Sequence, residues 1–359
     1  MKKTQVALAA MALVASTAVL ADGVKLYGTV DASVAKSTGA SVKMDGAGNW
    51  AGSIFGMTGS EDFDGGSVFF NLEGGVNLAD GSATNNGSMA ATFNRKTNIG
   101  ISSGAGTVTV GLQLSPYIGA ALGGIVNNNE SFYVPLLSLV GDRTVSALAV
   151  SGGNGTGSTG ANTSAFFVNN AVSYSTPSIN GIKATVLSRI SGGTTENKYR
   201  AYSVSYAAAE NLTINYGYQT SEGYTNFANL ALTEGAYTTS VISGTYVMGD
   251  NTIGLALFNH NDKANSSKTS TTMAGIGHKV NDQVTVGLQY AKNDADTASG
   301  ITNLGAQYKL GATSYLYVTA SRATGGASAL YSTRANGWST LNSSTAGETG
   351  YAVGMVKSF

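Results

Sequence analysis

The side chains that most often carry chemistry are few and scattered in this sequence. There is no cysteine, which excludes disulfides, thiolate metal sites and a cysteine nucleophile. The two histidines, His260 and His278, stand in no serine–carboxylate pattern that would make either the base of a hydrolase. We expect His260 to be solvated. The acidic pairs at 62–64 and 294–296 supply too few ligands for a calcium loop. The residues therefore predict no enzyme, no metal site and no cofactor.

A glycine-rich stretch at 152–157 is the remaining candidate for ligand chemistry, as a cradle for phosphate. It follows no strand-to-helix pattern, so the sequence does not favour that role. The whole chain has 20 basic and 20 acidic residues, a balance that gives no electrostatic footprint for nucleic acid. We expect no nucleic-acid partner.

The first 21 residues predict a secretory signal peptide. A short basic start precedes an apolar run from 6 to 20, and Ala21 supplies the small side chain that a signal peptidase prefers. A membrane-anchor helix is the alternative, but the run is short for a bilayer span and an Asp-Gly pair follows at once. We expect cleavage after Ala21 and a folded chain from 22 to 359.

The folded chain, residues 22 to 359, is predicted to consist of β-strands. From residue 24 onward, sixteen short segments alternate apolar with small or polar side chains. Clear examples are 212–219, 252–257 and 284–290. In 347–359, Tyr351, Val353, Met355 and Phe359 share one face, and small or polar residues occupy most of the other. Segments with one apolar and one wet face are typical of an antiparallel sheet.

The connections between these segments fall into two classes that alternate along the chain. The tight ones are 61–65, 103–105, 177–180, 208–210, 248–250, 280–282 and 310–312. The others, mostly longer and polar, are roughly 35–50, 78–90, 117–164, 192–198, 222–234, 261–269, 295–299 and 324–346. A soluble sandwich has no reason to sort its connections this way, whereas a membrane barrel has short turns on one side and long loops on the other. We therefore predict an all-β fold, a 16-stranded antiparallel transmembrane β-barrel without helices, closed by its first and last strands.

Aromatic residues near the predicted strand ends form two sets. The tight-turn side carries Tyr174, Tyr206, Tyr246, Tyr308 and Phe359. The loop side carries Phe166, Tyr218, Tyr290 and Tyr351. Two aromatic belts are typical of a barrel in a membrane, although strand preference alone could explain any one of these residues.

Several stretches, in their order and spacing, resemble one known family. They lie at 24–31, 59–73, 93–95, 99–101, 106–111, 170–178 and 352–359. Together they resemble the Gram-negative general porins of the neisserial and β-proteobacterial type. The resemblance implies a homotrimer in outer-membrane lipid, each subunit a water-filled channel for passive diffusion of small hydrophilic solutes and ions. It also implies that Phe359 belongs to the signal read by the outer-membrane insertion machinery. A plugged barrel acting as a surface adhesin or structural outer-membrane protein is the alternative.

The third long connection, 117–164, corresponds by this resemblance to a constriction loop that folds inward. The stretch 132–150 is apolar and should not dangle in water, although the low-complexity stretch 152–160 would also suit a disordered external insertion. Folded inward, the loop would bring Glu130, Asp142 and Arg143 to the lumen.

The chain departs from the family at three wall positions that often carry basic residues. Here they hold Ile54, Leu112 and Ser173, so anion selectivity cannot be carried over. Strand parity and motif position give these wall candidates for the pore lining: Lys25, Asp31, Glu73, Lys96, Leu112 and Ser173. Because the charges nearly balance, we expect weak selectivity that leans to cations.

Overall fold

The computed structural model describes residues 23–38, 41–46, 48–81, 92–126, 167–190, 199–226, 231–262, 267–294, 300–324 and 349–359. They form seventeen strands and one short helix. The strands are β1 (Val24–Ser37), β2 (Lys43–Asp45), β3 (Ile54–Phe63), β4 (Gly66–Gly75), β5 (Thr97–Ser103), β6 (Gly106–Leu114), β7 (Phe167–Ser175), β8 (Ile182–Arg189), β9 (Tyr199–Ala209), β10 (Leu212–Asn226), β11 (Ala231–Met248), β12 (Asn251–Asp262), β13 (Ser267–Lys279), β14 (Val284–Asn293), β15 (Gly300–Gly311), β16 (Ser314–Thr324) and β17 (Thr349–Ser358).

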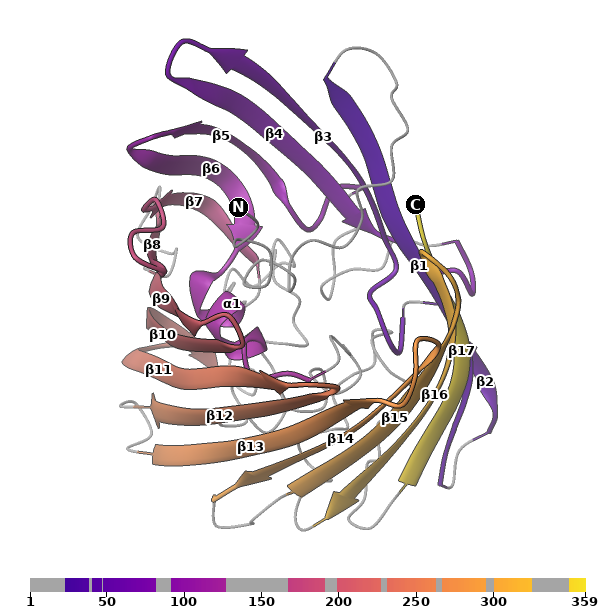
Figure 1. The fold of residues 1–359 in the computed structure, drawn as a ribbon. Coiled ribbons are helices and arrows are strands. Elements are labelled where there is room, and N and C mark those ends of the chain that lie inside the picture. The colour runs from indigo at the N-terminus through magenta and orange to yellow at the C-terminus, as the bar shows by residue number, and fades with distance from the viewer. Residues whose placement is uncertain are drawn as a thin grey trace.

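All strands except β2 form one closed antiparallel ring, which confirms the predicted 16-stranded barrel (Figure 1). From β3 to β17 each strand pairs with its neighbour in the chain, and β1 closes the ring by pairing with both β3 and β17. The short strand β2 pairs with the end of β1. Closure leaves no open edge in the ring, as a barrel within lipid requires.

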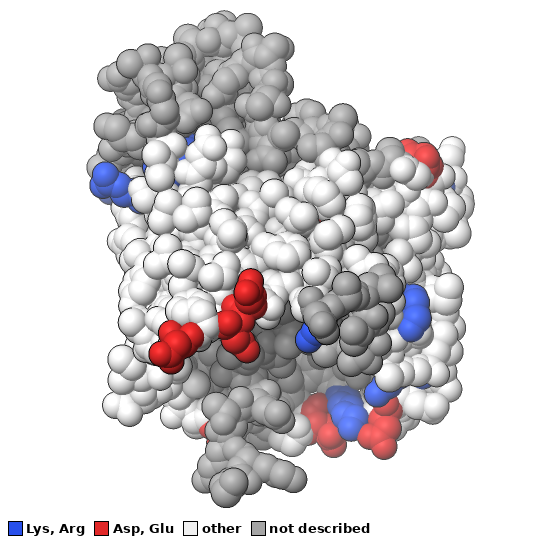
Figure 2. Space-filling view, turned by 90° about the horizontal axis from the view of Figure 1, so that it is seen from above, with Lys and Arg blue, Asp and Glu red and all other residues white. Residues whose placement is uncertain are grey.

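Alternation assigns the two faces of the wall. On β17 the side chains of Tyr351, Val353 and Met355 are exposed on the outside, whereas Ala352 and Val356 face inward and are buried. Figure 2 shows one side of the molecule, where a broad band free of Lys, Arg, Asp and Glu lies between charged residues nearer the edges. An uncharged outer band is the surface that lipid tails prefer.

The seven tight turns lie where the sequence predicts them, but the hairpin of β10 and β11 is longer than expected. These strands reach Asn226 and begin again at Ala231, so most of the predicted loop 222–234 is strand, with a register shift between Glu222 and Tyr224. Polar sequence suggested a loop there. Threonine and tyrosine also favour strands, and continued pairing satisfies the backbone beyond the membrane.

The prediction of a chain without helices is wrong in one place. The helix α1 (Pro116–Leu122) follows β6 directly, with proline in its first turn, where a fixed φ and a missing N–H cost little. It belongs to the third long connection and not to the wall, and Figure 1 shows it inside the ring. Among the described residues, no helix has the length and apolar character needed to cross a bilayer.

The aromatic residues of the tight-turn set all lie exposed near the strand ends: Tyr174, Tyr206, Tyr246, Tyr308 and Phe359. Of the loop-side set, Tyr290 and Tyr351 are exposed, and Tyr218 stacks on Tyr202 with ring centroids 4.8 Å apart. Phe166 lies outside the described residues. The described members therefore stand at both ends of the strands.

Candidate functional site

The interior of the barrel is the candidate functional site, and the start of the third connection lies in it. Tyr117, Ile118 and Ala120 on α1 and Val126 just beyond it are buried in the main apolar cluster. The helix contacts β9, β10 and β11, and the Ser243 hydroxyl donates a hydrogen bond to the Ala120 carbonyl. The segment 116–126 is therefore seated on the inner wall.

Glycines on the inner wall leave the room that the segment 116–126 needs to pack there. A side chain at Gly217 would collide with Ala120, and one at Gly254 would collide with the Gly124 carbonyl. A side chain at Gly275 would crowd Val126. Glycine in a strand often marks such a close approach of another part of the chain.

A second group inside the barrel surrounds Asp31 on β1. The carboxylate is fully buried, and its Oδ2 accepts the backbone N–H groups of Trp50 (2.7 Å) and Ala51 (2.8 Å). Its Oδ1 accepts the Tyr317 hydroxyl at 2.7 Å, across the closing strands of the ring. The Ser53 hydroxyl accepts the Asp31 N–H and donates to its carbonyl. The first long connection thus folds onto the inner wall and encloses this carboxylate.

Aromatic packing holds the same segment. Trp50 lies against Tyr317 with ring centroids 5.2 Å apart and meets Tyr315 edge-on at 6.2 Å. Val356 completes this buried cluster. The Tyr317 ring also occupies the space where a side chain at Gly354 would be. Three segments far apart in the sequence therefore meet at one place on the wall.

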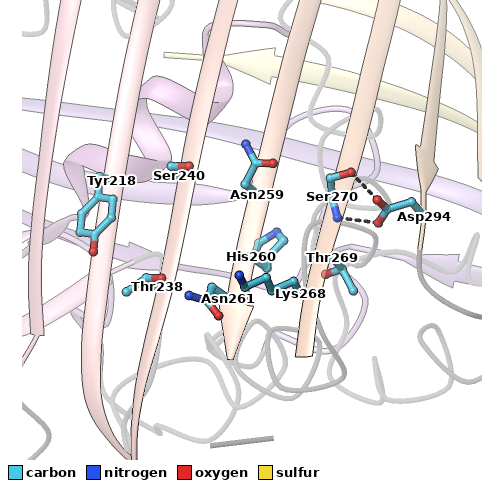
Figure 3. Close-up of a pocket in the computed structure, with 10 residues that line it drawn as sticks. All are labelled: Tyr218, Thr238, Ser240, Asn259, His260, Asn261, Lys268, Thr269, Ser270 and Asp294. Carbon is cyan, nitrogen blue, oxygen red and sulfur yellow. Dashed lines mark hydrogen bonds between the residues drawn. The ribbon is translucent and has the colours of Figure 1, made fainter. Parts of the chain in front are cut away.

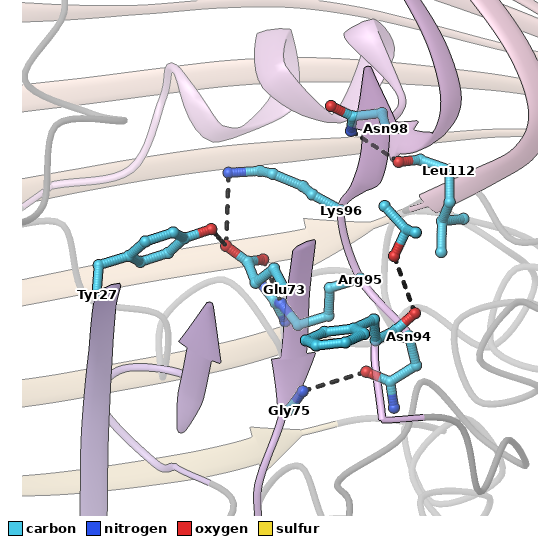
Figure 4. Close-up of polar contacts among 10 residues, drawn as sticks. Tyr27, Glu73, Gly75, Asn94, Arg95, Lys96, Asn98 and Leu112 are labelled. Carbon is cyan, nitrogen blue, oxygen red and sulfur yellow. Dashed lines mark hydrogen bonds and ion pairs between the residues drawn. The ribbon is translucent and has the colours of Figure 1, made fainter. Parts of the chain in front are cut away.

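A third group is ionic and centres on Glu73 of β4 (Figure 4). The buried Glu73 carboxylate accepts the Arg95 Nε–H at 2.8 Å and the Tyr27 hydroxyl at 2.9 Å, and the Lys96 Nζ lies 3.7 Å away. Lys96 is 37% exposed, compared with 2% for Glu73. Two cations thus surround one carboxylate, and the more accessible charge of the group is positive.

Two arginines near the lumen were missed by the sequence reasoning. The Arg95 guanidinium lies 4.9 Å from the centre of the Phe167 ring, and that of Arg189 lies 5.8 Å from the centre of Tyr199. Alternation along β8 could have found Arg189, since buried Leu187 two residues earlier faces inward. Arg95 precedes β5, so no strand periodicity applied to it.

The other wall candidates are scattered. The Ser173 hydroxyl donates to Gln113 Oε1, and the Leu112 carbonyl accepts a hydrogen bond from Asn98 at 2.9 Å. Lys25 is exposed at the start of β1, opposite Thr58. Of the predicted residues, the structure joins Glu73 to Lys96 and leaves the others apart. Glu130, Asp142 and Arg143 lie outside the described residues.

The expectation that His260 is solvated is wrong. It lies on β12 and is only 3% exposed, and its Nδ1 is 3.1 Å from the Thr239 hydroxyl oxygen. The strand continues to Asp262, two residues beyond the histidine, so alternation turns this side chain inward. His278 is exposed, and its Nδ1 is 3.0 Å from Asn251 Oδ1.

A closed membrane barrel with charged and polar groups along its inner wall defines the class of outer-membrane channels. The chain belongs to the Gram-negative porins, because the model of that family matches residues 7–355. No curated protein matches the sequence. The family and the fold make the protein an outer-membrane channel for passive diffusion of small hydrophilic solutes and ions.

Solved structures share the fold at low sequence identity. The anion-selective porin from Comamonas acidovorans is similar with a TM-score of 0.71 and 21% identity, over 94% of this chain and 99% of that one. OmpT of Vibrio cholerae in its trimer form is similar with a TM-score of 0.63 and 12% sequence identity, over 94% of this chain and 99% of that one. Salmonella typhi OmpF in complex with daunomycin is similar with a TM-score of 0.64 and 11% sequence identity, over 94% of this chain and 97% of that one.

Proposed function

We propose that the protein works as a homotrimer of channels, each narrowed from inside by its third long connection, 117–164. This proposal rests on the packing of residues 116–126 against the inner wall. The rest of the third connection must continue from that point. The outward apolar side chains Leu26, Val34 and Val353 on β1 and β17 supply a surface that a second copy could cover. A solved relative described as a trimer has the same fold.

We further propose that export depends on cleavage of residues 1–21 and that the protein has no enzymatic activity. The porin family and the barrel support a channel in place of a catalyst. Two of the buried polar side chains, Ser243 and Asp31, hold chain segments against the wall.

Planar-bilayer recording tests the channel, the trimer and the constriction together. A single insertion of the wild-type protein is expected to close in three equal steps, one for each subunit. Replacing residues 130–160 by a short Gly-Ser linker is expected to raise the conductance of every step, because the lumen loses material that narrows it. Unchanged conductance in this variant would contradict an inward third connection, and a wild type without conductance would indicate a plugged barrel.

We propose that the pore discriminates only weakly between cations and anions. The geometry argues against the weak preference for cations that the sequence suggests. Asp31 is enclosed by the first connection, and Glu73 is buried between Arg95 and Lys96. Neither carboxylate can readily meet a passing ion, whereas Lys96 is partly exposed. Groups in a narrow wet pore act over roughly the Debye length, about 8 Å at physiological salt.

Lys96→Glu is expected to shift the reversal potential in a KCl gradient toward cation selectivity, and more so at low salt, where screening is weaker. Lys36→Glu is the matched control, since Lys36 is opposite Tyr351 on the outer face of the wall and should leave the potential unchanged. An equal shift in both variants would show that Lys96 has no special access to the conducting path.

A further inference from the structure

The wall changes its backbone geometry at the point where the third connection leaves it. Gly111 on β6 has a φ of 119° and Asn170 on β7 has a φ of 50°, both in the left-handed region that favours glycine. The pairing register of the two strands shifts between Gly111 and Gln113, so that Asn169 and Asn170 together lie opposite Leu112. An extra residue of this kind is a β-bulge, which bends the strand that carries it.

The bulge interrupts the alternation of side chains along β6. Val108 and Val110 are exposed on the outer face, but Leu112, two residues further on, is buried. The Leu112 carbonyl accepts its hydrogen bond from the side chain of Asn98 (Figure 4). The last residues of β6, up to Leu114, therefore no longer follow the two-face rule of the wall.

Gln113 supplies hydrogen bonds at the bulge. A bulge leaves backbone groups without their partners in the sheet, and buried backbone groups need partners. The Gln113 Nε2 lies 3.2 Å from the Thr109 carbonyl oxygen and 3.4 Å from that of Gly111, both on β6. It also lies 3.2 Å from the Ala171 carbonyl oxygen on β7, and the Gln113 Oε1 accepts the Ser173 hydroxyl. One buried side chain thereby binds both strands at the bulge.

The bulge lies directly before the segment that enters the lumen. Helix α1 starts at Pro116, and the Ser115 hydroxyl oxygen lies 2.7 Å from that of buried Tyr199 on β9. The Tyr199 hydroxyl donates to Gln219 Oε1 on β10 at 2.7 Å. Between Gln113 and Pro116 the chain is therefore fixed on two sides, to the bulge and to β9 and β10.

A hairpin at the same end of the wall has no such bulge. In β12 and β13 the pairing runs to Asp262 and Ser267 without a register shift, and Figure 3 shows Asn261 and Lys268 near the ends of these strands. Regular pairing keeps both strands in the wall. The β6–β7 bulge, in contrast, precedes a chain that leaves the wall for the interior, where α1 contacts β9, β10 and β11.

We propose that Gln113 is a positioning residue of the channel: its amide holds the β6–β7 bulge, and the bulge directs the third connection toward β9–β11 and into the conducting path. This role rests on the proposed function, in which the third connection narrows the pore. Gln113 is buried, so it acts through the backbone and not by touching a solute. Without its hydrogen bonds the chain from 114 onward takes several directions, and the width of the constriction varies.

Gln113→Met keeps the length of the side chain and removes both hydrogen-bonding groups. In planar-bilayer recordings this variant is expected to show a severalfold larger variance of the open-channel current than the wild type. In liposome-swelling assays the rate for a trisaccharide relative to a monosaccharide is expected to rise, because a displaced constriction rejects large solutes less strictly. Gln307→Met is the matched control: Gln307 lies opposite buried Tyr317, so it also faces inward, and the variant should behave as the wild type does.

A second pair of variants tests the bulge from outside the lumen. The Asn170 side chain is exposed, and alternation with exposed Tyr174 places it on the outer face. Asn170→Val puts a β-branched residue at a φ of 50°, which such a residue tolerates poorly, so the bulge should shift and the variant should resemble Gln113→Met. Asn170→Gly accepts this φ and should behave as the wild type does.

Urea unfolding in detergent identifies a role in stability alone. If Gln113→Met lowered the free energy of unfolding but kept the current variance and the sugar ratio of the wild type, the positioning role would be overturned. So would equal behaviour of Asn170→Val and Asn170→Gly. The linker variant of residues 130–160 separates the two proposals. A raised conductance there, with wild-type behaviour of Gln113→Met, overturns the positioning role alone, whereas no change in either variant overturns both.

Discussion

Asp31→Ala is expected to release residues 49–53 from the inner wall and to lower the free energy of unfolding by about 3 to 5 kcal/mol. The substitution removes the acceptor for two backbone N–H groups and the Tyr317 hydroxyl, all in buried surroundings. Buried donors left without partners each cost about 1–3 kcal/mol. Because the released segment, which includes Trp50, no longer packs against Tyr317, single-channel recordings of Asp31→Ala should also become noisier.

Urea unfolding of the protein in detergent measures this effect, with two further variants as references. Tyr317→Phe removes one of the three donors and should cost about 1 kcal/mol. Asp62→Ala removes an exposed carboxylate at the other end of the wall and should change stability by less than about 0.5 kcal/mol. If Asp31→Ala resembled Asp62→Ala, the network around Asp31 would have no stabilising role.

Phe359→Ala is expected to reduce the amount of folded porin in the outer membrane severalfold, with little change in the conductance of the channels that form. The N–H and carbonyl of Phe359 pair with Gly28 at 3.0 Å, and the aromatic ring covers Gly28 where β17 closes on β1. By the family resemblance, this residue also belongs to the signal read during insertion. Its ring lies on the outer face, away from the lumen, so conduction should be spared.

Leu288→Ala is the control for this experiment, because Leu288 is also an exposed apolar residue on the outer face but lies on β14, away from the closing strands. Fractionation and heat-modified mobility would give the folded amount, and bilayer recordings the conductance per channel. Normal outer-membrane levels of Phe359→Ala would contradict a special role for the terminal residue. A matching loss in Leu288→Ala would point to lost apolar surface instead of closure or recognition.

The barrel wall could be predicted from the sequence because its rule is local. A strand that faces lipid on one side and a wet or packed interior on the other must alternate every second residue, and turns between such strands need few residues. Tyr351, Val353 and Met355 satisfy this rule without reference to any distant residue. The same rule failed where polar residues also pair as strand, as in the extension of β10 and β11.

Which segments and which charges lie inside the barrel depends on contacts between residues far apart in the sequence, and no local pattern encodes those contacts. Parity placed Asp31 and Glu73 on the inner face, but accessibility depends on what covers each carboxylate. Asp31 is covered by Trp50 and bound by Tyr317, 286 residues later in the chain. Arg95 reaches Glu73 from a connection that has no strand periodicity.

The sequence by itself therefore determined the number of strands, the two faces of the wall and the positions of the tight turns, because each follows from short-range alternation. Only the tertiary structure decided which charges remain accessible and where the connections lie inside. Closing the ring brings β1 beside β17, and only then can the first connection bind Tyr317. Likewise, Gly217 and Gly254 leave room for residues 116–126 only when the third connection reaches β10 and β12.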